Sequence, residues 1–162
     1  MPKKPVIVNN TPLIALWELN YLFLFRELYT EVWIPQAVED EFIATEQIGR
    51  RAALNNAPYI KTVPLSHPQS ALAYTGLHQG EASVLALAEE HDARLVIIDE
   101  RKARRYAQRI GLPLTGTIGV LLLAKKEGLI DAIKPLLTTL HDNGLYLSVS
   151  LIDKALQLAD ET

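Results

Sequence analysis

Polar side chains directly follow three apolar runs that we expect to be strands. Asn9 comes after the run Val-Ile-Val, Asp99 after Leu-Val-Ile-Ile, and Thr115 after Leu-Pro-Leu. In an open parallel sheet, ligands bind in the crevice beyond the carboxyl ends of the strands. These residues therefore indicate where a site would lie, although Asn and Asp are also ordinary turn and capping residues.

Two further carboxylates fall on the apolar faces of predicted helices. Glu41 shares a helical stripe with Val38 and Phe42, and Glu81 shares one with Val84 and its apolar neighbours. A carboxylate on such a stripe lies at the rim of the core or has a partner. The structural alternatives are that Glu81 interacts with the helix dipole in the first turn, and that Glu41 is a rim residue paired with an arginine.

Three carboxylates at one crevice would repel one another and raise each other's pKa values unless a cation lay among them. Oxygen ligands suit Mg²⁺ or Mn²⁺, and the chain has no cysteine and no zinc-type spacing among its four histidines. Such an ion activates water and shields a phosphodiester from the carboxylates. If they converge, Glu41, Glu81 and Asp99 are therefore the expected catalytic and metal-binding residues.

Short apolar runs alternate with helical patterns along the chain. Strands are expected at residues 6–8, 32–34, 59–63, 95–98 and 112–114. Helices are expected at residues 13–28 as two short helices, 35–42, 80–91, 100–110, 118–126 and 133–141, and after residue 148. Thr11 is expected to cap the first helix, with Pro12 in its first position. Residues 43–58 look helical and then turn-forming, and residues 66–79 show no clear pattern.

This alternation implies βαβ units, which join parallel strands by right-handed crossovers. We find no repeat, low-complexity tract or linker in the sequence. The expectation is an α/β fold in one domain that spans residues 1–162.

The composition is that of an ordinary globular protein, with 49% hydrophobic and 22% charged residues. The lack of cysteine excludes disulfide scaffolds, thiolate zinc sites and cysteine nucleophiles. No signal peptide is recognisable and no apolar run approaches the roughly 20 residues that span a membrane, so we expect a cytoplasmic location. A net charge of −3 argues against a protein held on nucleic acid by bulk charge alone.

Basic residues are concentrated just after Asp99. Five of the 16 lysines and arginines lie within residues 101–109. A helix there would begin beside the predicted site, where it could meet an RNA backbone, and a solvated basic face is the alternative. Arg101 is the favoured phosphate-binding residue because it is nearest to Asp99 in sequence, and Arg104 and Arg105 are further candidates.

Aromatic residues are concentrated near the start of the chain, where six of the 11 fall within residues 17–33. Core packing of a helical hairpin explains this concentration. A groove for a second copy or for a small partner protein is the alternative.

The order and spacing of several motifs resemble the PIN-domain family, to which VapC-type toxin ribonucleases belong. The motifs are VIVNNTPLI at the start, IPQAV running to Glu41, GEA opening a helix, Leu95 through Arg101 with Asp99 at the strand end, and TGTIGVL from Thr115. The resemblance covers nearly the whole chain. It implies a three-layer α/β fold in which a central, mostly parallel sheet is flanked by helices.

The family's four acidic positions fall on Asn9, Glu41, Glu81 and Asp99, which we call the quartet positions. Three of them match the family. Asn9 stands where the family normally has Asp, so this position keeps an oxygen for coordination but loses a negative charge. Glu100 is a candidate replacement carboxylate, although consecutive residues leaving a strand tend to point apart.

The resemblance implies a ribonuclease that hydrolyses RNA phosphodiester bonds with Mg²⁺ or Mn²⁺, acts as a toxin neutralised by a small antitoxin protein, and forms a homodimer. It also places Thr11 and Thr117 near the metal as hydroxyl donors to water or phosphate, with helix capping as the alternative for both. The competing hypothesis, motivated by Asn9, is a PIN-like module that binds RNA or protein without catalysis. A nucleotide-binding regulatory domain is disfavoured because the sequence has no Gly-rich phosphate loop.

Overall fold

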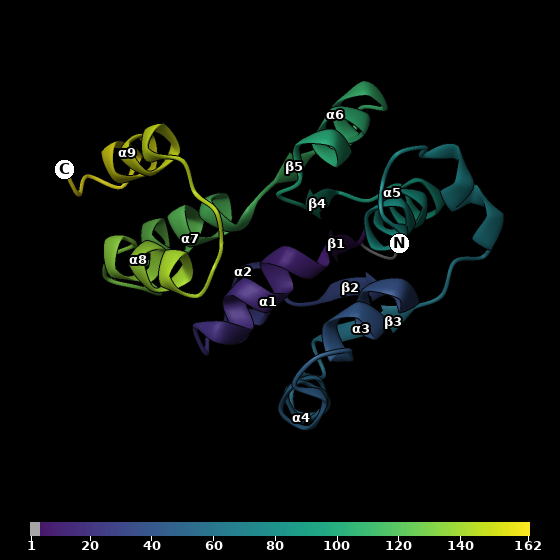
Figure 1. Ribbon diagram of the computed structural model, residues 1–162, viewed down its shortest axis with the longest axis horizontal. Coiled ribbons are helices and arrows are strands. Elements are labelled where there is room, and N and C mark those ends of the chain that lie inside the picture. Colours follow the sequence, from purple (N-terminus) through teal and green to yellow (C-terminus); the bar gives the residue numbers. More distant parts are fainter. Residues whose placement is uncertain (1–3) are drawn as a thin grey trace.

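A five-stranded parallel sheet forms the centre of the computed structural model, which describes residues 4–162 (Figure 1). Its strands are β1 (Val6–Val8), β2 (Val32–Pro35), β3 (Ile60–Val63), β4 (Leu95–Ile97) and β5 (Leu114–Thr115). The strand order is β3-β2-β1-β4-β5, and every neighbouring pair is parallel. The order therefore reverses between β1 and β4, and in such sheets the ligand crevice lies at the carboxyl ends of the two strands at the reversal.

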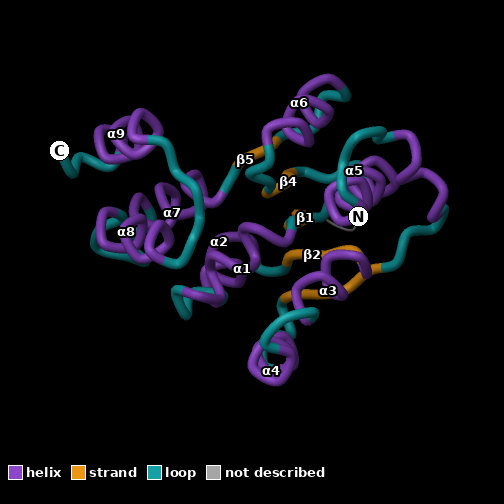
Figure 2. The backbone as a smooth tube through the Cα atoms, viewed as in Figure 1, coloured by secondary structure: helices purple, strands orange, loops and turns teal. Residues whose placement is uncertain are grey.

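Helices flank this sheet on both sides (Figure 2). They are α1 (Asn10–Glu18), α2 (Phe23–Tyr29), α3 (Gln36–Ile43), α4 (Gln47–Asn55), α5 (Gln79–His91), α6 (Arg101–Arg109), α7 (Thr117–Lys126), α8 (Lys134–Asp142) and α9 (Val149–Leu158), with a 3-10 helix η1 (Pro68–Ala73) before α5. The α/β prediction is confirmed, and the described sheet is wholly rather than mostly parallel. Within residues 4–162, no helix has the length and apolar character needed to cross a membrane.

Two predicted elements begin two residues away from their observed starts, for identifiable reasons. Asn9 rather than Thr11 occupies the N-cap position of α1, because the chain leaves β1 extended at Asn9 and turns helical at the next residue. The last strand begins at Leu114 rather than at residue 112, because the Leu112 amide donates to a carbonyl at the end of α6 and Pro113 has no N–H to donate. The short helix η1 was not predicted, since residues 66–79 carry no periodic apolar pattern.

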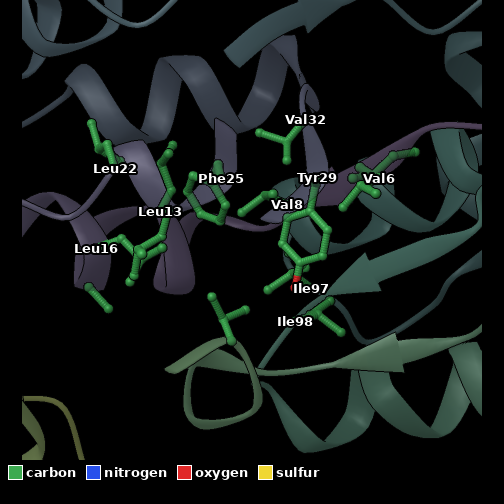
Figure 3. Packing of buried hydrophobic residues seen from close by; sticks show 14 of the residues in the cluster. Val6, Val8, Leu13, Leu16, Leu22, Phe25, Tyr29, Val32, Ile97 and Ile98 are labelled. Atoms are coloured by element: carbon green, nitrogen blue, oxygen red, sulfur yellow. The ribbon is translucent and has the colours of Figure 1, made fainter. Parts of the chain in front are cut away.

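The core lies between the central strands and the helices that cover them. Ile7 of β1 and Ile97 of β4 are fully buried, as expected for strands with both faces covered. Figure 3 shows strand residues such as Val8 together with Leu13 of α1 and Phe25 of α2 in this core. Of the six early aromatic residues, two are buried in this core and the other four are half-buried against it, as the hairpin-core interpretation expected.

Candidate functional site

Asn9 and Asp99 lie at the carboxyl ends of β1 and β4, the two strands at which the sheet order reverses. The backbone N–H of Asn9 donates to the Ile97 carbonyl at 2.9 Å. This hydrogen bond continues the pairing of Val8 with Ile97 one step past the strand. The Asn9 residue is only 3% exposed, and its side chain makes no capping hydrogen bond to α1. The sequence prediction therefore placed both residues at the correct edge of the sheet.

The carboxylate of Asp99 is held by the first residue of α7. The Thr117 amide donates to Asp99 Oδ1 at 2.8 Å, and the Thr117 hydroxyl donates to Oδ2 at 2.5 Å. A Cβ atom at Gly116, the N-cap of α7, would overlap Asp99 Oδ1, so glycine permits this close approach. Thr117 thus lies at the predicted site, but as the residue that positions Asp99 rather than as a helix cap.

Glu41 is held by a residue that the sequence interpretation did not single out. Asn10 Nδ2 donates to Glu41 Oε2 at 2.9 Å, and a Cβ atom at Gly80 would lie 2.8 Å from Glu41 Oε1. The partner of Glu41 is therefore an amide of α1 and not an arginine. Asn10 Oδ1 is buried and accepts no hydrogen bond from the part of the chain that the structure describes. The Asn9-Asn10 doublet after the strand was the available signal.

Glu81 occupies the third position of α5 and completes a capping box with His78. Its Oε1 accepts the His78 amide at 3.1 Å. Burial raises the pKa of Glu81, the His78 amide opposes this, and the charges of Glu100 and Glu41 raise the pKa further, so that it lies above its ordinary value. Glu81 therefore caps α5 as the dipole alternative expected, and the charges of Glu100 and Glu41 act on its carboxylate. Its catalytic and metal-binding role stays a prediction.

Glu100 is the N-cap residue of α6, and this capping is expected to stabilise the fold. Its two carboxylate oxygens accept the Lys102 amide at 3.0 Å and the Ala103 amide at 2.7 Å. Glu100→Ala should therefore lower the free energy of unfolding by about 1 kcal/mol and Tm by roughly 2–4 °C. Glu100→Asp, which keeps an acceptor, is the matched control. Thermal unfolding in high salt, which screens the repulsion from Glu81, measures the effect, and equal Tm values for both variants would contradict it.

Among the basic residues of α6, Arg104 rather than Arg101 lies beside Asp99. Arg104 Nη1 donates to the Ile98 carbonyl at 2.7 Å, and a Cβ atom at Gly116 would lie 3.2 Å from it. Arg101 and Arg105 are exposed and do not line the cavity next to Asp99. The preference for Arg101 followed sequence distance, whereas Arg104 returns to the strand end because it lies one helical turn beyond the N-cap.

Thr11 is not brought to Asp99. It lies in the first turn of α1 and lines a different hollow, together with Ile14 and Leu140. Its proposed contact with water or phosphate stays a prediction.

The donor set at the quartet positions suits Mg²⁺ or Mn²⁺, because it consists only of carboxylate and amide oxygens. The unpartnered oxygen of Asn10 and the raised pKa of Glu81 both fit a nearby cation. However, no three His, Cys, Asp or Glu side chains within residues 4–162 are grouped closely enough to hold a metal ion. The expected convergence of three carboxylates is thus not preformed, and metal binding by these residues stays a prediction.

Comparison with known proteins identifies the family of the chain. A family model described as "DUF3368: PIN domain" matches residues 5–161. No curated protein matches the chain significantly. PIN domains are typically nucleases and generally use divalent metals. Since the family match spans nearly the whole sequence, the chain belongs to the PIN-domain family.

Proposed function

We propose that the protein is an endoribonuclease that hydrolyses RNA phosphodiester bonds with Mg²⁺ or Mn²⁺. The observation that carries this proposal is the placement of Asp99 at the reversal of the strand order, with both of its oxygens oriented by Thr117. The Glu41 carboxylate of α3 lies against Gly80 of α5, the residue before Glu81, and its charge raises the pKa of Glu81. Family membership supports a nuclease in general.

In this proposal each residue at the site has a distinct role. Glu41, Glu81 and Asp99 would hold the ion, with Asn9 as a weaker, uncharged ligand. A bound Mg²⁺ or Mn²⁺ supplies an activated water and neutralises charge on the phosphate. Thr117 orients Asp99, and Arg104 binds a phosphate oxygen of the RNA beside it.

Cleavage of RNA by the purified protein tests the proposal. Single-stranded and structured RNAs are incubated with the protein in Mn²⁺, in Mg²⁺ and in chelator, and the products are resolved on denaturing gels. We expect cleavage that needs the divalent ion. Cleavage that persists in chelator, or no cleavage with either ion, contradicts the assignment.

A second candidate function is a PIN-like module that binds RNA or protein without catalysis. Two observations favour it: the loss of a charge at Asn9, and the absence of a preformed group of three acidic or histidine ligands among residues 4–162. This candidate predicts RNA or protein binding with no cleavage in any divalent ion.

Asn9→Asp separates the two candidates. An added carboxylate at this buried position should lower the Tm of the metal-free protein, because it adds a charge among other carboxylates. Mn²⁺ should then raise Tm more than in the unmodified protein, since binding to the folded state stabilises it, and cleavage should increase. Asn20→Asp, at an exposed turn residue, is the matched control. Equal Mn²⁺ responses and no cleavage by either the variant or the unmodified protein would favour the binding module.

The likeness to toxin ribonucleases also supports a biological setting. We propose a single domain over residues 1–162 that forms a homodimer, acts in the cytoplasm and is neutralised by a small antitoxin protein encoded beside it. Size-exclusion chromatography with light scattering tests the dimer. Co-expression with the product of the adjacent gene tests the antitoxin, since a true antitoxin should co-purify and suppress cleavage.

A further inference from the structure

A cavity of about 370 Å³ adjoins Asp99. One wall is formed by Asp99, Arg104 and the start of α7, and the other by residues 145–147, the segment that joins α8 to α9. Figure 1 shows this segment passing in front of α7 on its way between the two helices. The volume falls within the range of sites that hold small organic ligands.

Tyr146 lines this cavity, and its ring has no aromatic packing partner among residues 4–162. The residue is 85% exposed, and its ring makes no aromatic contact or hydrogen bond within the described part of the chain. Other tyrosines are packed: Tyr21 and Tyr106 meet other rings edge-on, and Tyr59 lies under Arg26. An unpaired ring beside a polar site offers a flat apolar face to a ligand.

Arg104 supplies a positive charge on the wall of the cavity that faces Tyr146. One of its guanidinium nitrogens donates to the Ile98 carbonyl, and none of the carboxylates in residues 4–162 forms an ion pair with it. The contact with the strand end holds this half-buried side chain at the cavity, and its remaining N–H groups are available to an anion. Arginine in such a position suits a phosphate.

We propose that this cavity is a nucleotide subsite in which Arg104 binds a phosphate and Tyr146 stacks on the base of single-stranded RNA next to the bond held at Asp99. The inference rests on the proposed function, because it takes RNA as the ligand. Single-stranded RNA is required, since a base must leave its own stack to expose a face to the ring. Apolar residues of the cavity, Leu147 and Leu151, pack around the base edge.

Equilibrium binding tests the subsite without relying on cleavage. A short, labelled single-stranded RNA is titrated with the protein in Ca²⁺ and followed by fluorescence anisotropy, and its integrity is checked afterwards on a denaturing gel. Tyr146→Ala should weaken binding about tenfold, the typical loss for one stacked base, whereas Tyr146→Trp should retain it. Ile48→Ala, which removes an apolar side chain of a residue 90% exposed on α4, should leave Kd unchanged.

A series of oligonucleotides, each lacking one base, identifies the stacked nucleotide. At one position, loss of the base should weaken binding of the unmodified protein about tenfold and add nothing to the effect of Tyr146→Ala. An unchanged Kd for Tyr146→Ala, or an equal loss with every abasic oligonucleotide, overturns the subsite. If the protein binds in this way but does not cleave in Mn²⁺, the nuclease proposal fails and the subsite stands.

Discussion

Asp99→Asn is expected to lower Mn²⁺-dependent RNA cleavage by about 100-fold or more while leaving the fold intact. Loss of a residue that merely supports a metal ligand already costs about 10–100-fold in affinity or activity, so loss of a charged ligand should cost at least as much. The side chain of Asp99→Asn keeps an oxygen that accepts a hydrogen bond from the Thr117 backbone N–H. The Thr117 hydroxyl can rotate to accept a hydrogen bond from the new side-chain NH₂ group. The local structure at the start of α7 should therefore persist.

Initial cleavage rates and thermal unfolding, measured on the same preparation, check this result. Asp153→Asn, which removes the same charge from an exposed residue of α9, is the matched control and should cleave normally. A Tm close to that of the unmodified protein separates lost chemistry from lost folding. Full cleavage by Asp99→Asn would remove Asp99 from the site and with it the proposed arrangement.

Glu161→Gln is expected to destabilise the protein by about 3 kcal/mol, the largest effect on stability that we predict. The Glu161 carboxylate accepts the Ile133 amide at 2.8 Å, the Lys134 amide at 3.0 Å and Lys125 Nζ at 3.0 Å. Only 11% of this side chain is exposed. The Glu161 carboxylate thus connects the last residues of the chain to α7 and to the start of α8. Hydrogen bonds to a charged group contribute about 1.5–3 kcal/mol each.

The same substitution should change how stability depends on pH. Burial raises the pKa of Glu161, but the amides of Ile133 and Lys134 and the ammonium of Lys125 outweigh burial and hold the pKa below its ordinary value. A carboxylate with a lowered pKa stabilises the folded state above its unfolded pKa, and this contribution is lost as the pH falls through the folded pKa. Glu161→Gln should therefore lose less stability than the unmodified protein on acidification below about pH 4.5.

Urea unfolding at a series of pH values measures both effects of Glu161→Gln. Asp160→Asn removes the neighbouring exposed carboxylate and should leave the free energy of unfolding nearly unchanged. If the free energy of unfolding fell equally with acidification for Glu161→Gln and for the unmodified protein, Glu161 would not make this charge-dependent contact.

The elements that could be predicted are those whose pattern is local. The β-branched run at Val6 and the apolar run at Leu95 become strands because their side chains are buried on both faces, and burial of that kind is visible in a short window of sequence. The lateral order of the strands was not predictable in the same way. It depends on which strands pair across the sheet, and β1 pairs with β4, about 90 residues away along the chain.

In the candidate site, too, only the features that depend on local sequence were predictable. Asn9 and Asp99 follow from strand ends, whereas the contact of Asn10 with Glu41 depends on how α1 crosses α3, which no local pattern records. Arg104 rather than Arg101 lies at the strand end because helix geometry, and not sequence distance, decides which side chain of α6 returns there. Tyr146 was missed altogether, since it reaches the cavity only when the segment between α8 and α9 folds back over the start of α7.

The four quartet positions come from four separate connections of the sheet: those that follow β1, β2, β3 and β4. None of these side chains shares its connection with another, so each can change without altering the backbone that presents the rest. Where these positions bind the metal as proposed, evolution can therefore remove metal-binding charge one residue at a time while selection for folding stays satisfied. In the proposed arrangement Asn9 is one such change, and a chain of this architecture could then pass gradually from a nuclease to a binding protein with its sheet intact.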